Sequence, residues 1–345
     1  MRRASEVRRI YGLTMTHVDI IIVNWNGRRY LPPCLDALAQ QTHQEMTIWL
    51  VDNGSVDDSV DYAQQHHPQV RVFRNTDNRG FAAANNQAIR AGVAPYVVTL
   101  NNDTQPEPTF LATLLDALEQ HPRAGMAASK MLFAQNPGMI NSAGIAVDRL
   151  GIAWDRCGGA ADSETNTDPQ FIFGACAGAA MYRRAMLDDV GLFAEDFFAY
   201  LEDVDLAWRA QSAGWQALYV PTARVLHHHS ATAGEGSPFK SRLLGRNKLW
   251  LIARNYPTPY LWWYLPLIAL YDVGAFLYAA VARRDLYAMR GRLDGMRGLR
   301  HAWQQRRGLL RRASSARMMA LLQPIQPPWR VMRRYRHLRK TQTRQ

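Results

Sequence analysis

Runs of Asn, Asp and Gly follow stretches of β-branched and aromatic residues at four places in the first third of the chain. These runs are Asn24-Trp-Asn-Gly27, Asp52-Asn-Gly-Ser55, Asn78-Arg-Gly80 and Asn101-Asn-Asp103. Their carboxylate and amide oxygens are ligands that suit a divalent cation carrying phosphates. The same residues are common in tight turns, so one run alone fits either a phosphate site or an ordinary turn.

The stretches before these runs predict buried strands over residues 18–23, 47–51, 70–73 and 96–100. Helices are expected between them, over residues 28–41, from 56 onward and over 81–91, and another is expected through residue 118. This alternation predicts an α/β fold with a Rossmann-like, mostly parallel sheet and helices on both faces. The carboxyl ends of parallel strands share one edge, so the four polar runs should meet there.

Two common nucleotide-binding motifs are missing from the sequence. No Gly-x-Gly-x-x-Gly follows the first strand, and no Gly-Lys-Ser or Gly-Lys-Thr occurs. A Rossmann dehydrogenase and a P-loop NTPase are therefore both disfavoured.

An acidic cluster begins the helix expected over residues 201–210. Glu202, Asp203 and Asp205 lie in its first turn, where the helix dipole alone would favour acids. A carboxylate there could also act as a general base, and its acidic neighbours would raise its proton affinity. A strand over 217–220 is followed by three histidines from His227, which fit either a metal site or a solvated turn.

Positive charge is concentrated at the end of the chain. The net charge of the 345 residues is +12, and 18 of the 41 Lys and Arg residues lie between Arg283 and Gln345, beside only two acids. Such a tail suits anionic lipid or nucleic acid. The chain has three cysteines without metal-type spacing, which argues against a disulfide framework and for a reducing compartment.

Residues 260–282 form an aromatic-rich apolar stretch near the ~20 residues that span a bilayer. Pro266, Asp272 and Gly274 interrupt it, so it fits a membrane-embedded or re-entrant segment, or a buried core hairpin. Arg283 and Arg284 follow at once, which favours the cytoplasmic side. Residues 1–16 contain arginines but no apolar segment, so no signal peptide is expected.

Six motifs in this order resemble the family-2 glycosyltransferases of the GT-A fold, and among them the bacterial rhamnosyltransferase-like branch. The resemblance covers roughly residues 17–255. The motifs are Val23-Asn-Trp-Asn-Gly27, Val51-Asp-Asn-Gly-Ser55, Asn78-Arg-Gly-Phe-Ala82, Leu100-Asn-Asn-Asp-Thr104, Phe197-Phe-Ala-Tyr-Leu-Glu-Asp-Val-Asp-Leu206 and Val225-Leu-His227.

The resemblance implies an inverting transfer of a sugar, rhamnose in this branch, from a nucleoside diphosphate donor. It implies that Asp203 is the base, with Glu202 beside it, and that Asp103 and His227 hold Mg²⁺ or Mn²⁺. Asn101 replaces the first acid of the family's Asp-x-Asp motif, which leaves one secure carboxylate. The donor-binding residues that it implies are Asn24, Asn26, Asp52, Asn53, Arg79, Gly80 and Asn102.

We expect an N-terminal extension (1–16), a GT-A domain (17–235) with a donor half to about residue 105 and an acceptor half from about 106, and a C-terminal helical, membrane-associated basic region (236–345). The expected partners are dTDP-rhamnose, a lipid-linked or oligosaccharide acceptor and the cytoplasmic face of the bacterial inner membrane. Nucleic acid is not expected. Two alternatives are a sugar nucleotidyltransferase and a basic nucleic-acid-binding protein that uses the tail.

Overall fold

A computed structural model describes residues 16–165, 167–228, 237–282 and 284–327. Nearly all of the predicted N-terminal extension and the last part of the basic tail, residues 328–345, lie outside the described residues.

The donor half is a parallel sheet, as the sequence predicts. Strands β1 (Val18–Asn24), β2 (Met46–Asn53), β3 (Arg71–Asn75) and β4 (Tyr96–Asn101) lie in the order β4-β1-β2-β3. Helices α2 (Leu31–Ala39), α3 (Ser59–His66) and α4 (Gly80–Ala91) connect them. Side chains alternate along β1, so Ile21 packs with α4 on one face while Ile20 and Ile22 pack with α2 on the other.

The acceptor half turns the sheet into a mixed one. Strand β11 (Ala179–Arg183) runs antiparallel between β4 and β6 (Ala124–Phe133), and β12 (Gln216–His227) is parallel to β6. Strands β5 (Thr104–Pro106), β7 (Asn136–Ser142) and β10 (Gln170–Ile172) complete this sheet with antiparallel pairs. The mostly parallel pattern therefore holds in the donor half only, because short links such as the one between β6 and β7 permit only antiparallel neighbours.

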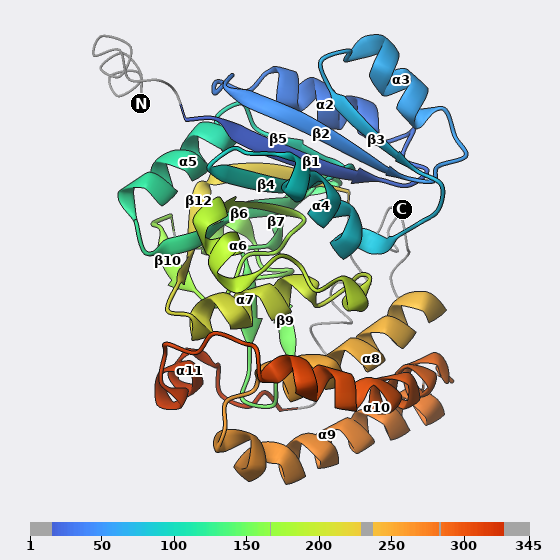
Figure 1. Cartoon of the computed structure of the whole chain (residues 1–345), viewed down its shortest axis with the longest axis vertical. Coiled ribbons are helices and arrows are strands. Elements are labelled where there is room, and N and C mark those ends of the chain that lie inside the picture. The colour runs from blue at the N-terminus through green and yellow to red at the C-terminus, as the bar shows by residue number, and fades with distance from the viewer. Residues whose placement is uncertain (1–15, 166, 229–236, 283, 328–345) are drawn as a thin grey trace.

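Three further helices belong to the acceptor half. Helix α5 (Phe110–Gln120) joins α2 on one face of the sheet, while α6 (Arg184–Val190) and α7 (Glu202–Ser212) lie on the other. A short hairpin of β8 (Ile145–Val147) and β9 (Ala153–Asp155) packs beside α7 (Figure 1).

Helices α8 (Pro238–Asn255), α9 (Tyr260–Ala282) and α10 (Tyr287–Arg306) gather at one end of the molecule, with α11 (Ser315–Leu321) nearby (Figure 1). Helices α8 and α10 touch backbone to backbone, since a Cβ at Gly291 would lie 2.0 Å from the carbonyl oxygen of Arg242. Helix α8 also packs on α7, so the C-terminal helices contact the acceptor half directly.

Helix α9 is one continuous helix with a largely exposed apolar surface. Leu261 and Ile268 are buried, whereas Trp262, Trp263 and Leu270 are exposed. The core-hairpin interpretation of this segment is therefore wrong. Within the part of the chain that the structure describes, residues 260–281 are the one candidate that is long and apolar enough to cross a membrane.

Candidate active site

Asn24 lies at the centre of a hydrogen-bond network at the carboxyl ends of β1 and β2. Its Nδ2 donates to Asp52 Oδ1 at 3.0 Å, Ser55 Oγ at 3.2 Å and Ser59 Oγ at 2.8 Å. Its Oδ1 accepts from Asn102 Nδ2 at 2.9 Å. Asn24, Asp52 and Asn102 are all buried, so three of the predicted donor residues form one interlocked group.

The neighbouring loops are fixed by the same kind of amide contacts. Asn26 has a positive φ of 51°, and its Oδ1 accepts the Val56 N–H. Asn53 Nδ2 donates to Gly80 O at 3.2 Å, at the start of α4. Arg79 is exposed beside this helix start, where peptide N–H groups and the helix dipole favour phosphate.

Asp103 and His227 come together although 124 positions separate them. Asp103 Oδ1 lies 3.2 Å from His227 Nε2, and both side chains are buried. Asn141 Oδ1 lies 2.8 Å from His227 Nδ1, so Nδ1 is the ring nitrogen that donates its proton there. In the neutral ring, Nε2 is then an acceptor facing a carboxylate oxygen, an arrangement that a shared cation stabilises.

This pair fits part of a divalent-cation site. Asn101 Nδ2 also lies 3.4 Å from His227 Nε2, at the position where a second acid would stand. No cluster of three or more His, Cys, Asp or Glu side chains suited to a metal occurs among the described residues. The protein therefore offers one carboxylate and one imidazole, and a cation held here would need further ligands from a phosphate-bearing substrate or water.

Asp203 has the environment of a proton acceptor. Burial raises its pKa from 3.8 to about 6, and the nearby Asp155 carboxylate on β9 adds to this effect. Its two oxygens accept backbone N–H groups, from Ala177 at 3.2 Å and Val204 at 2.8 Å, which fix the carboxylate while its side chain stays partly accessible. A carboxyl group with this pKa can accept a proton near neutral pH.

Glu202 lies deeper than Asp203. Burial and the adjacent Asp203 charge raise its pKa well above the usual value. No group among the described residues hydrogen-bonds its buried Oε2. A protonated Glu202 beside Asp203 keeps the two carboxyl groups from both carrying charge.

Asp205 has a different role from the other two acids of this turn. It is fully buried and contacts Arg209 Nε at 2.8 Å, Arg254 Nε at 3.3 Å and Asn255 Nδ2 at 2.7 Å. Burial opposes its charge, but the two arginines outweigh burial and lower its pKa. Its charge is thus paired, and Asp155 takes the place that we expected for Asp205 in raising the pKa of Asp203.

A short series of hydrogen bonds links Asp203 to the strand that leads to the Asp103–His227 pair. Ala177 N donates to Asp203, and Ala177 O accepts from Thr99 Oγ1 of β4 at 2.7 Å. The next residue, Gly178, accepts the Asn101 N–H at 2.8 Å through its carbonyl oxygen. The backbone of residues 177–178 therefore connects Asp203 of α7 to the rim of the sheet at the carboxyl end of β4, which leads to Asp103.

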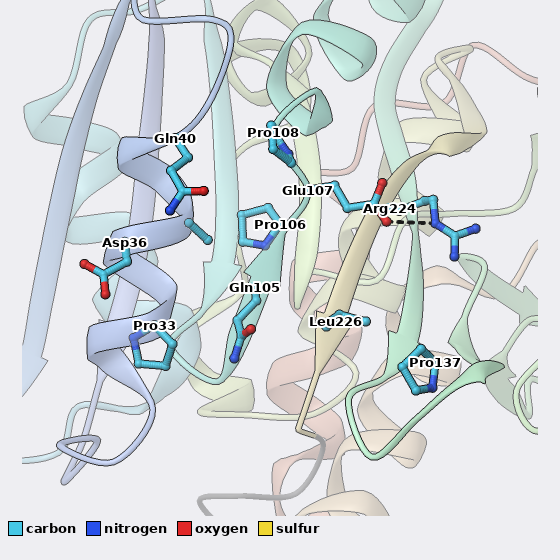
Figure 2. A pocket seen from close by; sticks show the side chains of 11 residues that line it. Pro33, Asp36, Gln40, Gln105, Pro106, Glu107, Pro108, Pro137, Arg224 and Leu226 are labelled. Carbon is cyan, nitrogen blue, oxygen red and sulfur yellow. Dashed lines mark hydrogen bonds and ion pairs between the residues drawn. The ribbon is translucent and has the colours of Figure 1, made fainter.

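A cleft with a volume of about 560 Å³ opens between α2 and β12, with Gln105 and Pro106 of β5 between them (Figure 2). Arg224 and Glu107 pair within it, at 3.0 Å. None of the predicted site residues lines this cleft.

Several residues with a place in the site escaped sequence reasoning. Asn141 orients His227, Asp155 acts on Asp203, and Ala177 supplies a backbone donor. They come from β7, β9 and a loop, whose sequences carry no motif of their own. The small-residue stretch around Gly178 is a sequence signal for close backbone approach that could have pointed to this region.

Comparisons with known proteins agree with this geometry. Residues 19–191 match the family described as glycosyl transferase family 2. The chain is 30% identical over 288 residues to the N-acetylglucosaminyl-diphospho-decaprenol L-rhamnosyltransferase of Mycobacterium tuberculosis, covering 73% of this chain and 89% of that protein.

Two solved structures share the fold. GalNAc-T7 with UDP, GalNAc and Mn²⁺ has a TM-score of 0.53 at 16% identity, covering 71% of this chain and 53% of its own. The mannosyltransferase PcManGT of Pyrobaculum calidifontis, with GDP-Man and Mn²⁺, has a TM-score of 0.51 at 18% identity, covering 88% and 85%. Both are GT-A glycosyltransferases, which confirms the predicted fold class. The chain is a glycosyltransferase and belongs to glycosyl transferase family 2.

Proposed function

We propose that the protein transfers rhamnose from dTDP-rhamnose, with inversion, to a hydroxyl of a lipid-linked saccharide. The M. tuberculosis relative is named for transfer of L-rhamnose to a diphospho-decaprenol-linked N-acetylglucosamine, which supports both the sugar and the kind of acceptor. The observation that carries the proposal is the set of contacts at the carboxyl end of β4. They connect Asp203, a carboxyl group with a raised pKa, through the backbone of residues 177–178 to the strand that leads to Asp103, which pairs with His227. Membership of a glycosyltransferase family sets aside the nucleotidyltransferase and nucleic-acid-binding alternatives.

The base step follows from the position of Asp203. The acceptor hydroxyl oxygen attacks the anomeric carbon from the face opposite the diphosphate, and the carbon–oxygen bond to the diphosphate breaks. The hydroxyl proton passes to a carboxylate oxygen of Asp203, which the Ala177 and Val204 N–H groups hold in place. Attack opposite the leaving group inverts the anomeric centre.

Asp103 and His227 would hold Mg²⁺ or Mn²⁺ together with the donor diphosphate. A bound divalent cation would supply neutralisation of the negative charge that develops on the departing diphosphate. Asn141 orients His227 for this role, and the buried Asn24–Asp52–Asn102 network shapes the donor side of the rim. Two structures with the same fold contain Mn²⁺.

Product analysis tests the reaction. Purified protein is incubated with Mg²⁺ or Mn²⁺, a polyprenyl-diphosphate-linked N-acetylglucosamine and one of several nucleotide sugars. We expect dTDP release and a rhamnosylated lipid with dTDP-rhamnose, and much less product with UDP- or GDP-sugars. Faster transfer from another donor would contradict the rhamnosyl assignment while leaving the family assignment intact.

We also propose that the C-terminal helices bind the cytoplasmic face of the bacterial inner membrane. The exposed side of α9 carries Trp262, Trp263 and Leu270, while Asp272 on its inner side pairs with Lys248 and Arg292. Helix α10 exposes Arg290, Arg297 and Arg300, and the exposed Arg307 follows it directly. An apolar face beside arginines suits an anionic leaflet, where a lipid-linked acceptor resides.

Vesicle flotation tests this surface. The triple variant Trp262→Ser, Trp263→Ser, Leu270→Ser should lose most binding to anionic vesicles, because it removes the exposed apolar side chains. The matched control is Val56→Ser, Val93→Ser, which removes exposed apolar residues of the donor half. Equal flotation of both variants would contradict the proposed membrane surface.

A further inference from the structure

The loop that leads into α7 has an unusual backbone. Three of its non-glycine residues have positive φ, with 65° at Phe198, 69° at Tyr200 and 69° at Leu201. Phe198 has ψ of −66°, and Ala199 N donates to Phe197 O at 2.8 Å, which makes a γ-turn of the rare, strained form. L-residues adopt such conformations only where the surrounding structure holds them.

Asn247 of α8 holds this turn. Its side chain is completely buried, and its Nδ2 donates to the carbonyl oxygens of Phe197 at 3.0 Å, Ala199 at 2.9 Å and Tyr200 at 2.7 Å. Its Oδ1 accepts from Arg246 Nε at 2.8 Å. One amide thus satisfies carbonyl groups on both sides of the strained residue.

Arg246 strengthens the same attachment. Its Nη2 donates to the carbonyl oxygens of Asp196 at 3.0 Å and Phe197 at 2.8 Å. The backbone of the loop before α7 is therefore held by two adjacent residues of α8, Arg246 and Asn247, and α8 lies outside the sheet.

The turn contacts the donor side of the site. Phe198 O accepts the Ala82 N–H of α4 at 3.1 Å. Gly80, in the loop that would face the donor diphosphate, has φ of 84°, and a Cβ there would lie 2.6 Å from Phe198 O. Only glycine permits this close approach, so the turn and the donor loop are in backbone contact.

The Phe198 turn also determines the position of Asp203, the proposed base. Leu201 is the N-cap residue of α7, and its carbonyl oxygen accepts the Asp205 N–H at 2.9 Å. Asp203 is the second residue of this helix. A shift of the 198–201 backbone would therefore move the Asp203 carboxylate relative to the donor loop.

We propose that Asn247 is a positioning residue for sugar transfer, which holds the Phe198 turn so that Asp203 and the Gly80 loop keep a fixed separation. This role rests on the function proposed above. Asn247 lies on the far side of the loop, so it acts only through the backbone that it binds. Helix α8 is then part of the catalytic apparatus as well as the start of the C-terminal region.

Asn247→Ala removes the amide group that donates to the three carbonyl oxygens. We expect kcat to fall roughly 30- to 100-fold with the donor KM changed less than about threefold, since a base displaced by ~1 Å costs about 10² in rate. The matched control is Gln211→Ala. Gln211 is a buried amide at the other end of α7 that donates to the carbonyl oxygens of Ile172 and Phe173. Its loss should lower the melting temperature but leave kcat within about threefold.

Hydrogen–deuterium exchange gives a readout that is independent of transfer. In Asn247→Ala, peptides from residues 194–206 should lose protection, while the same peptides in Gln211→Ala keep it. If the wild type makes no rhamnosylated lipid, the exchange comparison still decides whether Asn247 holds the loop. Lost protection together with full kcat would refute the positioning role alone.

Gly80→Ala perturbs the same turn from the opposite side without touching α8. It should raise exchange in residues 194–206 and lower kcat, which keeps the test open if Asn247→Ala does not fold. Unchanged exchange and unchanged kcat in Gly80→Ala would overturn the proposed connection between the donor loop and the base.

Discussion

The buried polar groups of the donor half and those in the first turn of α7 have opposite environments. In the donor half Asn24 hydrogen-bonds both Asp52 and Asn102, so these side chains hold one another in place. At the start of α7 Glu202 and Asp203 are enclosed together with raised pKa values. The groups that we propose for donor binding are thus stabilised by each other, whereas burial makes the groups that we propose for catalysis costly to ionise.

Removal of the cation should have the largest effect. EDTA should abolish transfer, and Asp103→Ala should reduce it by on the order of 10³-fold or more, because charge on the departing diphosphate would go uncompensated. Asp36→Ala, on the rim of the separate cleft, is the matched control and should keep near-wild-type activity. Full transfer in EDTA would show that the Asp103–His227 pair holds no catalytic cation.

Asp203→Asn should lower turnover by roughly 10² to 10⁴, the range of general-base catalysis, with donor affinity barely changed. Glu202→Gln should cost less. In the wild type, turnover should rise with pH up to about 6 and then level off, because only the ionised Asp203 accepts a proton.

Four ionisable side chains interact electrostatically with Asp203, namely Asp155, Glu202, Cys176 and Tyr182. Turnover and nucleotide binding are therefore measured across pH for both variants. A wild-type rate in Asp203→Asn, with collapse in Glu202→Gln, would mean that the base is misassigned. A parallel loss of donor binding would assign Asp203 to positioning the donor.

The same Asp-to-Asn change, made two residues apart, should shift stability in opposite directions. Asp203 has a folded-state pKa near 6 against 3.8 ordinarily, so the folded state loses stability as pH rises between these values. Asp203→Asn should therefore stabilise the protein at pH 7.5 by about 1–3 kcal/mol. Asp205→Asn leaves Arg209 and Arg254 poorly paired and should destabilise by about 3–5 kcal/mol.

Denaturant unfolding of the two variants at pH 7.5 and pH 4.5 measures this difference. The stabilisation by Asp203→Asn should shrink at pH 4.5, where wild-type Asp203 is already protonated. Destabilisation by both variants at pH 7.5 would indicate that the Asp203 carboxylate is not penalised by burial.

The smallest effect is expected in the donor network. Asn24→Ala removes one buried amide, so nucleotide affinity should weaken roughly tenfold while kcat stays within a fewfold of wild type. Titration calorimetry with dTDP measures the change, with Asn85→Ala on α4 as a matched buried-amide control. A loss of kcat with intact dTDP affinity would contradict the division between binding and catalytic groups.

The sequence predicted the donor half well because the continuous β-branched runs and the helical spacing there are local patterns. It also predicted that the polar runs after the strands meet at one edge, and the Asn24–Asp52–Asn102 contacts confirm this for three of them. The family resemblance selected Asp203 as the base, but residue patterns alone could not separate it from Asp205, which occupies the same helical turn. Their difference depends on Arg254, which is far away in the sequence, and on Asp155 of a short hairpin.

The mixed sheet of the acceptor half could not be predicted from the sequence either. Strands such as β11 are short and apolar, and their direction follows from where the preceding loop enters the sheet. Asn247 gave no signal either, because an asparagine within a basic helix reads as an ordinary surface residue.

The backbone contact between α8 and α10 bears on how chimeric enzymes are built. Exchanging everything after residue 256 between relatives would remove the helix that supports Asn247. Helix α9, in contrast, attaches to its neighbours mainly through Asp272 and a few buried side chains. Helix α9 can therefore be exchanged as a unit. A graft that replaces residues 260–281 should retain Asp272 and leave α8 and α10 in place. We expect such a graft to direct the enzyme to another lipid surface without changing its kcat.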